Sequence, residues 1–211
     1  MINFHTPTVA VPVLENSMYF DKEISFTLWV KTNSDSSDSH WFTFPRVQSS
    51  NNKVSQLFVN SGKMKFRHGD QIVFTIEFQD FMNVWTHVAM VITQDDSSNL
   101  SIDCYINGKL TKTGTYAGMR LGRSDPFEGF ILGNDVDGSL INNPSQYAAA
   151  QLTELYLYNR ASSSQEVEAA YNHRPSAVGR MVSWEEFSNM VNDNYGADVS
   201  KKPYPTEFRR I

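Results

Sequence analysis

The sequence predicts an all-β protein, an antiparallel β-sandwich with short helices and a tail at its C-terminal end. Short runs rich in aromatic and β-branched residues recur along the 211 residues, and clusters of Asn, Asp, Ser and Gly separate them. Two dipeptides between such runs are typical of tight β-hairpins. Hydrophobic residues make up 40% of the chain and aromatic residues 13%, which is enough apolar material to fill a core.

About ten segments fit the pattern of a strand. The dipeptide Asn107-Gly108 tolerates the positive φ angles of a type I′ turn, so the runs on either side of it are expected to be hairpin partners. Ser61-Gly62 predicts a second tight hairpin. The expected strands are 25–32, 41–47, 54–60, 63–68, 71–78, 85–93, 100–106, 109–115, 127–133 and 152–158.

Three polar stretches are expected to be loops. Residues 33–39 and 95–99 consist almost entirely of Asn, Asp and Ser, which favour turns and solvent. Residues 134–150 form a longer predicted loop. Because binding residues are often found on long loops, this stretch is the first candidate for a ligand site.

After the last expected strand, the spacing of the apolar residues changes from that of a strand to that of a helix. Ser163 and Glu166 fit a capping box, so a short helix is expected to begin there, run to about His173 and end before Pro175. The sandwich is therefore expected to span residues 1–174.

Residues 175–211 are expected to be an extension with one short amphipathic helix and a docking tail. A second capping box at 183–186 opens the helix, and it places Trp184 and Phe187 on one face. These two side chains either pack back on the sandwich, which we favour, or dock on a partner together with Phe208 of the tail. The second alternative would make the chain a component of a larger assembly.

Charge and composition exclude two classes of partner. The formal net charge is −5, and Lys and Arg are scattered singly, so we expect no nucleic-acid partner. No apolar run approaches the roughly 20 residues of a membrane span, and the first residues do not resemble a signal peptide. The only cysteine, Cys104, is expected to be a buried core residue. These features slightly favour a virion or a cytoplasmic assembly over secretion. Secretion is still an alternative, because residues 99–101 form an N-glycosylation sequon.

The order of several segments carries a family resemblance. An early strand is expected at 26–30, and later ones at 130–135 and 152–158. Between them lie two characteristic runs, Trp-Thr-His-Val-Ala at 85–89 and Tyr-Ile-Asn-Gly-Lys at 105–109. In this order the chain resembles the concanavalin A-like lectin and glucanase superfamily, and within it the laminin G-like and pentraxin-like jelly rolls. The resemblance implies a sandwich with a rim of loops, and the family includes lectins, receptor-binding modules and glucanases.

Two departures from the family pattern stand out. The family's last strand carries an Asp-Glu pair after a Gly and an apolar residue, whereas this chain has Thr153-Glu154. The segment 175–211 matches nothing in the family.

The sequence predicts no catalytic residues. A retaining glucanase on this scaffold needs paired carboxylates, supplied along one strand as Glu-x-Asp-x-x-Glu, and no such run occurs. Glu77 and Glu154 stand alone on their strands. His87 has no Ser or Asp partner nearby in the sequence and is expected to be a core or hydrogen-bonded histidine. The histidines show no zinc-ligand spacing. Because paired carboxylates, a triad and a zinc site are all missing from the sequence pattern, the chain is expected not to be an enzyme.

Calcium is the one cofactor that the sequence supports. Asn134, Asp135 and Asp137 offer hard oxygen ligands, and Gly138 permits a sharp turn after them. The resemblance implies calcium at the loop rim. A solvated acidic turn without a metal is the alternative interpretation.

Sugar binding would use aromatic side chains in or near loops, because their rings stack on pyranose faces. Trp41, Tyr116 and Tyr147 are the candidates. The functional hypothesis is a non-catalytic interaction module that binds carbohydrate or a protein partner. The alternative is a structural component of a virion or fibre anchored by its extension, and a glycoside hydrolase ranks last because its acids are missing.

Overall fold

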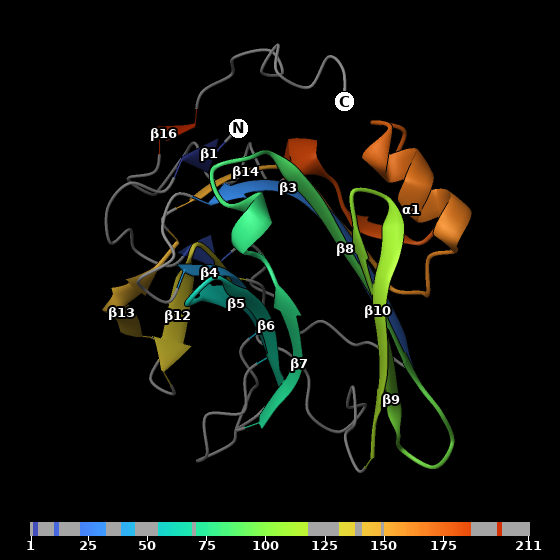
Figure 1. Ribbon diagram of the computed structural model, residues 1–211. Helices are drawn as coiled ribbons and strands as arrows, with labels where there is room; N and C mark the ends of the chain where they lie inside the picture. The colour runs from blue at the N-terminus through green and yellow to red at the C-terminus, as the bar shows by residue number, and fades with distance from the viewer. Residues whose placement is uncertain are drawn as a thin grey trace.

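In a computed structural model of the chain, two antiparallel sheets pack face to face, with a small two-stranded sheet beside them (Figure 1). This arrangement confirms the predicted β-sandwich. The residues described are 2–3, 11–12, 22–32, 39–44, 55–68, 71–117, 131–137, 141–148, 150–186 and 198–199.

The larger sheet has eight strands within these ranges, in the order β10-β9-β8-β3-β14-β1-β16 with β15 also paired to β14. The strands are β1 (Ile2–Asn3), β3 (Glu23–Thr32), β8 (Thr86–Gln94), β9 (Leu100–Ile106), β10 (Lys109–Tyr116), β14 (Ala150–Tyr158), β15 (Arg180–Val182) and β16 (Asp198–Val199).

The smaller sheet has the order β2-β11-β4-β5-β6-β7, and β12 pairs with β13 in the separate two-stranded sheet. These strands are β2 (Val11–Pro12), β4 (Ser39–Phe44), β5 (Ser55–Asn60), β6 (Lys63–His68), β7 (Gln71–Glu77), β11 (Ile131–Leu132), β12 (Asn134–Asp137) and β13 (Ile141–Tyr147). One 3-10 helix, η1 (Gln79–Phe81), and one α-helix, α1 (Ser164–Tyr171), complete the elements.

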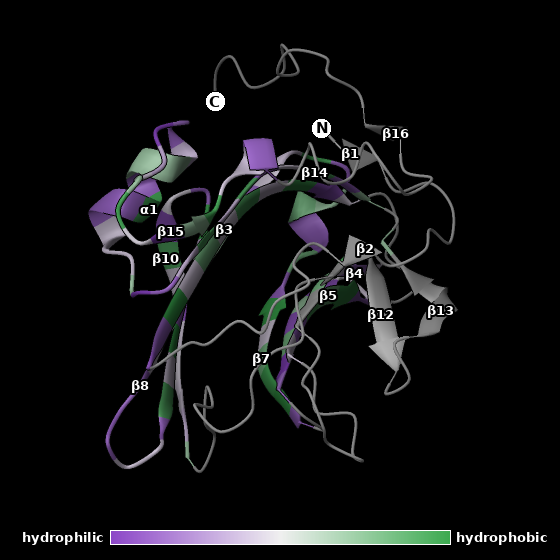
Figure 2. Ribbon diagram, turned by 180° about the vertical axis from the view of Figure 1, so that it is seen from behind, coloured by the Kyte–Doolittle hydropathy of each residue, from purple (hydrophilic) through white to green (hydrophobic). Residues whose placement is uncertain are grey.

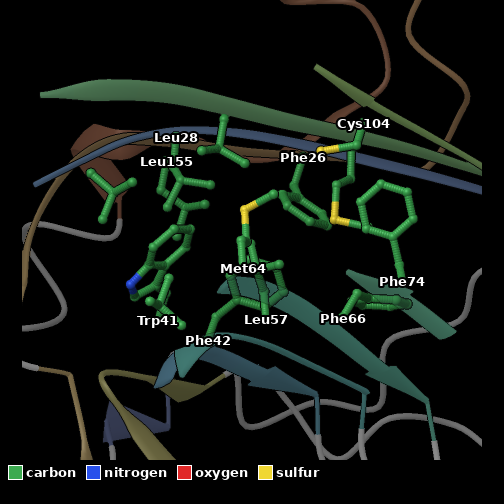
Figure 3. Close-up of a cluster of buried hydrophobic side chains, with 14 of the residues drawn as sticks. Phe26, Leu28, Trp41, Phe42, Leu57, Met64, Phe66, Phe74, Cys104 and Leu155 are labelled. Atoms are coloured by element: carbon green, nitrogen blue, oxygen red, sulfur yellow. The ribbon is translucent and has the colours of Figure 1, made fainter. Parts of the chain in front are cut away.

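The core lies between the two sheets, and Figure 3 shows side chains from both of them meeting there. Phe26 of β3 contacts Phe42 of β4 edge to face, with ring centroids 4.5 Å apart. Along β6, Met64 and Phe66 alternate with polar residues and are buried. Each large apolar side chain buried in this way contributes about 1.5–3 kcal/mol. Cys104 is also part of this core, as predicted.

Both predicted tight hairpins are confirmed. Asn107 and Gly108 have φ angles of 50° and 76°, and Ser61 and Gly62 have 51° and 69°, which are the positive values of type I′ turns. Gly108 also lies against α1: a Cβ atom there would come within 3.1 Å of the Tyr171 ring. This turn therefore needs glycine both for its conformation and for space.

The prediction of one long loop at 134–150 is wrong. Residues 134–137 and 141–147 pair as the antiparallel strands β12 and β13. Their Asn- and Asp-rich sequences have low β-propensity, and pairing beside β4 overrides this local preference.

Helix α1 begins with the predicted capping box. The Ser163 hydroxyl accepts a hydrogen bond from the Glu166 N–H, and the Glu166 carboxylate accepts one from the Ser163 N–H at 2.9 Å. Arg160 donates to the same carboxylate at 2.9 Å and lowers the pKa of Glu166 to about 2. Val167 and Ala170 form the buried face of the helix on the larger sheet.

Replacing Ser163 with Ala should lower the free energy of unfolding by about 1 kcal/mol, because one helix N–H loses its acceptor. Urea denaturation of the two proteins measures the difference. Ser164→Ala is the matched control, since Ser164 is exposed and lies one position inside the helix. Equal losses for the two variants would contradict the capping role.

The first part of the extension joins the sandwich. Leu157 of β14 pairs with Val182 of β15. Ser183 and Glu186 form the second predicted capping box through reciprocal hydrogen bonds of 2.6 and 3.2 Å. Trp184 is half-buried and packs against the chain's own core, as in the favoured alternative.

Phe187 and Phe208 lie outside the described residues, so their docking on a partner stays a prediction. No helix within the described ranges is long and apolar enough to cross a membrane.

Candidate functional site

The β12–β13 hairpin brings together residues that the sequence assigns to two separate sites. Asn134, a candidate calcium ligand, pairs directly with Tyr147, a candidate sugar-stacking residue. Asp137 pairs with Ile141, and the register shifts between Asn134 and Val136, at Asp135. Directly opposed residues on antiparallel strands have Cβ atoms about 4.5–5.5 Å apart. The three oxygen-bearing residues and Tyr147 therefore belong to one small structural unit.

Backbone hydrogen bonds fix the base of this hairpin to strand β4. The Gly133 N–H donates to the Trp41 carbonyl at 3.0 Å, and the Ala148 N–H donates to the Gly133 carbonyl at 2.8 Å. Gly133 has a φ of 77°, which favours glycine at this position. Figure 1 shows β12 and β13 beside β4 at one side of the sandwich. The hairpin is thus held in a fixed place relative to the core.

Trp41 is a correction to the sugar-binding prediction. Its side chain is fully buried and contacts Phe78 edge to face, with ring centroids 5.4 Å apart. A ring that is packed on all sides within the core cannot stack on a saccharide. Figure 3 shows Trp41 between the sheets, among the other core side chains.

Tyr116 lies on a different part of the molecule from the hairpin. It pairs with the core residue Leu100 at the end of β10, is half-buried and packs against the core. Burial raises the pKa of its phenol. The structure therefore does not bring Tyr116 together with Tyr147.

Strand β6 carries a charged face that the sequence reasoning missed. Met64, Phe66 and His68 point into the sandwich, so Lys63, Lys65 and Arg67 lie on the outer face of the smaller sheet. In Figure 2, hydrophilic and hydrophobic segments lie next to one another near the β5 and β7 labels of this sheet. In the sequence these residues look like scattered single charges, but their spacing of two along a strand places them on a common face.

Phe58 of β5 forms a rigid floor beneath two of these cations. The Lys65 ammonium lies 5.9 Å from the centroid of the Phe58 ring, and the Arg67 guanidinium carbon lies 5.7 Å from it. The His40 ring stacks on Phe58 at 4.8 Å with an interplanar angle of 10°. Phe58 and His40 are buried, whereas Lys65 and Arg67 are half-buried.

A second cluster missed in the sequence lies between the larger sheet and the end of α1. The His173 Nδ1–H donates to the Glu154 carboxylate at 3.0 Å, and Glu154 is only 2% exposed. The His173 ring stacks on Trp29 at 5.4 Å, and Tyr171 stacks on Trp29 at 5.5 Å. This arrangement fastens the helix to the sheet.

Two residues of this cluster have a conformation unusual for non-glycine residues. Glu154 has a φ of 50°, within a register shift of β14, and His173 has a φ of 59°. The His173 N–H donates to the Ala170 carbonyl, and the next N–H donates to the Ala169 carbonyl at 2.8 Å, which is a Schellman ending of α1. Each such conformation costs about 1–3 kcal/mol and is kept where surrounding contacts compensate for it.

His87 is a buried histidine of this region, as predicted. Its ring contacts Trp29 and Tyr171, and burial, with His173 nearby, lowers the pKa of His87 to about 3. The imidazole is therefore neutral at pH 7. Neither ring nitrogen has a hydrogen-bond partner among the described residues, so His87 has no triad geometry.

Glu77 and Glu154 do not form a hydrolytic pair. Glu77 lies on β7 of the smaller sheet and forms an ion pair with Lys63 at 3.1 Å, whereas Glu154 lies on β14 of the larger sheet. Within the same ranges no three His, Cys, Asp or Glu side chains are arranged as a metal site. The side chains of residues 134–137 lie outside that set, so the calcium prediction there stays untested.

Comparison with known proteins identifies the family. The family model described as "Concanavalin A-like lectin/glucanases superfamily", a laminin G model, matches residues 5–168, which is well over half of the chain. The chain belongs to this superfamily. Comparison with curated proteins finds no similar sequence. The superfamily assignment confirms the resemblance seen in the order of the strand segments.

Solved structures with this superfamily's fold are similar at low sequence identity. A native heptameric SAP-like pentraxin from Limulus polyphemus is 16% identical, with a TM-score of 0.57 over 92% of this chain and 82% of that one. The receptor binding domain of botulinum neurotoxin C/D mosaic serotype is 14% identical, with a TM-score of 0.51 over 72% of this chain and 36% of that one. A Trypanosoma rangeli sialidase is 14% identical, with a TM-score of 0.50, and this chain covers 22% of it. At these identities the likeness shows the fold alone.

Proposed function

We propose that the chain is a non-catalytic carbohydrate-binding module whose ligand contacts the β12–β13 hairpin with the help of a calcium ion. The observation that carries this proposal is the pairing of Asn134 with Tyr147, on the strands that also contain Asp135 and Asp137. Candidate metal ligands and a candidate stacking residue share one short hairpin. A binding role also agrees with the superfamily, which includes lectins.

The donor set fits calcium. One amide oxygen and two carboxylates are hard oxygen ligands, and Ca²⁺ takes about six to eight oxygens at 2.3–2.6 Å. Asn134, Asp135 and Asp137 would hold the ion, and its remaining coordination positions would accept saccharide hydroxyls. Tyr147 would supply an aromatic face for the sugar ring.

A binding module suits the chain better than a hydrolase. The strand carboxylates Glu77 and Glu154 lie on different sheets, and each already has a cationic or histidine partner. A retaining glycosidase needs two carboxyl groups about 5–5.5 Å apart. Glu77 and Glu154 do not meet this requirement, because they lie on different sheets.

Asp135→Asn with Asp137→Asn should abolish calcium binding, because both carboxylate charges are removed while side-chain size is kept. Isothermal titration with CaCl₂ measures the affinity, and a glycan array with and without EDTA measures saccharide binding. The wild-type protein should lose its glycan signal in EDTA, and the double variant should lack that signal.

Asp80→Asn is the control, since Asp80 is exposed on η1 in another part of the chain. It should bind calcium and glycans like the wild type. Glycan binding that survives both EDTA and the double substitution would overturn the hairpin site.

A further inference from the structure

Arg67 has no counter-charge in the described part of the molecule. Its guanidinium packs over the Phe58 ring. Its Nε–H is buried and has no hydrogen-bond acceptor. Lys65 likewise has no carboxylate partner there, and its ammonium donates to the Asn60 side-chain oxygen at 2.7 Å. Two neighbouring cations on the same face therefore have no carboxylate partner in the described part of the chain.

This face differs in sign from the protein as a whole. The chain has a formal net charge of −5. Strands β4 to β7, as far as they are described, carry Lys63, Lys65 and Arg67 but a single carboxylate, Glu77, which already pairs with Lys63. Among the described residues of these strands, the charge around Lys65 and Arg67 is thus positive, and positive charge attracts anions.

The buried Nε–H of Arg67, which has no acceptor among the described residues, is costly. Leaving a buried donor unsatisfied costs about 1–3 kcal/mol, and more for a charged group. Sites of this kind usually have a reason, such as an ion or ligand that completes them. Lys63, which has a carboxylate partner on the same face, shows how the neighbouring cation is neutralised within the chain.

We propose that Lys65 and Arg67 bind the oxyanion of an acidic saccharide, a carboxylate or a sulfate ester, on the outer face of the smaller sheet. This inference rests on the proposed carbohydrate-binding function and names the class of saccharide. The guanidinium fork matches the two oxygens of a carboxylate or sulfate, and the ammonium adds a second charge. The two residues are two positions apart on one strand, or about 6–7 Å.

Phe58 preorganises this pair. Packing on its ring holds both cations close to one another, and the Lys65–Asn60 hydrogen bond restrains the lysine side chain. Less side-chain freedom is then lost when a ligand binds. Phe58 itself is 4% exposed, so it supports the cations and does not stack on the sugar.

The test compares dextran, dextran sulfate and polygalacturonate as immobilised probes in the presence of calcium. Dextran and dextran sulfate differ only in sulfate groups, and polygalacturonate carries carboxylates alone. The wild-type protein should bind at least one acidic polymer and should bind dextran at least tenfold more weakly. Affinity for the acidic polymer should fall with rising NaCl, because charge attraction is screened.

Arg67→Gln and Lys65→Gln should each weaken binding of the acidic polymer at least tenfold, and Arg67→Lys should restore part of the loss through its charge. Lys22→Gln is the charge-matched control, since Lys22 forms an ion pair with Asp96 away from this face. It should change the affinity less than twofold. Thermal unfolding of each variant checks that the fold is kept.

The outcomes separate this inference from the proposed hairpin site. Binding of dextran as tight as that of dextran sulfate, or an Arg67→Gln protein with unchanged affinity, overturns the oxyanion site. If calcium-dependent binding of neutral glycans remains in that case, the hairpin site stands alone. If acidic polymers bind through Arg67 without any effect of EDTA, the oxyanion site stands and the hairpin site fails. Absence of binding to every acidic polymer also overturns the inference.

Discussion

Replacing Trp41 with Ala should lower the free energy of unfolding by about 3–5 kcal/mol, the usual cost of removing a large aromatic side chain from a core. Trp41 is fully buried and packs against Phe78 between the two sheets. Such a loss is a large part of the 5–15 kcal/mol that typically separates folded from unfolded proteins. Urea denaturation followed by far-ultraviolet circular dichroism gives the difference.

The control for this prediction is Leu110→Ala. Leu110 is 56% exposed, so its truncation should change stability by less than about 1 kcal/mol. A Trp41→Ala protein with wild-type stability that no longer binds glycans would contradict the core role and restore the stacking interpretation. A destabilised protein that still binds glycans when folded would support the hairpin site instead.

The protein should lose stability progressively as the pH falls below 6.5, and His87 should contribute to this loss because its pKa is lowered in the folded state. The folded state keeps the pKa of His87 near 3, whereas an unfolded histidine has its ordinary value of 6.5. Between these values the unfolded chain binds one proton more, so its free energy falls relative to the native state. At about 1.4 kcal/mol per pKa unit, the loss reaches on the order of 4–5 kcal/mol at pH 3.

Glu166 also makes the protein less stable as the pH falls, but over a lower pH range. Its native pKa is about 2, mainly because of the hydrogen bond from Arg160, and its unfolded value is 4.5. Its contribution is complete above pH 4.5 and disappears between pH 4.5 and 2. Measurements between pH 6.5 and 4.5 therefore isolate His87 from Glu166.

His87→Leu provides the decisive comparison. The side chain no longer titrates, so the slope of unfolding free energy against pH between 6.5 and 4.5 should become much shallower than in the wild type. Urea denaturation at half-unit pH intervals measures both slopes. An unchanged slope in the variant would show that another group takes up the proton.

Several parts of the site could be predicted from the sequence. Asn134, Asp135, Asp137 and Tyr147 were singled out by chemistry alone, as oxygen donors and an aromatic near an expected loop. The structure adds that they share one hairpin, which depends on the register of β12 against β13. Register in this stretch has no strong sequence signal, since its strands lack the alternation that fixes pairing elsewhere.

Other parts of the candidate site could not be predicted. The alternation of apolar and polar residues shows which side chains share a face of a strand, but it does not show which other elements pack on that face. Trp41 and Tyr147 look alike in sequence, as aromatic residues beside polar stretches. Only the packing of the second sheet buries Trp41. In the same way, the pairing of Glu154 with His173 joins residues 19 positions apart through the Schellman ending of α1.

The sequence by itself determined the sandwich, its two tight hairpins and the two helix caps, because these depend on period-two alternation, on residues that accept positive φ and on hydrogen bonds between residues close in the chain. Tertiary structure alone decided which aromatics are buried, which strands form the hairpin beside β4 and which cations have no carboxylate partner among the described residues. The physical reason is that burial and neutralisation depend on atoms brought from distant strands, whose positions exist only once the two sheets have packed.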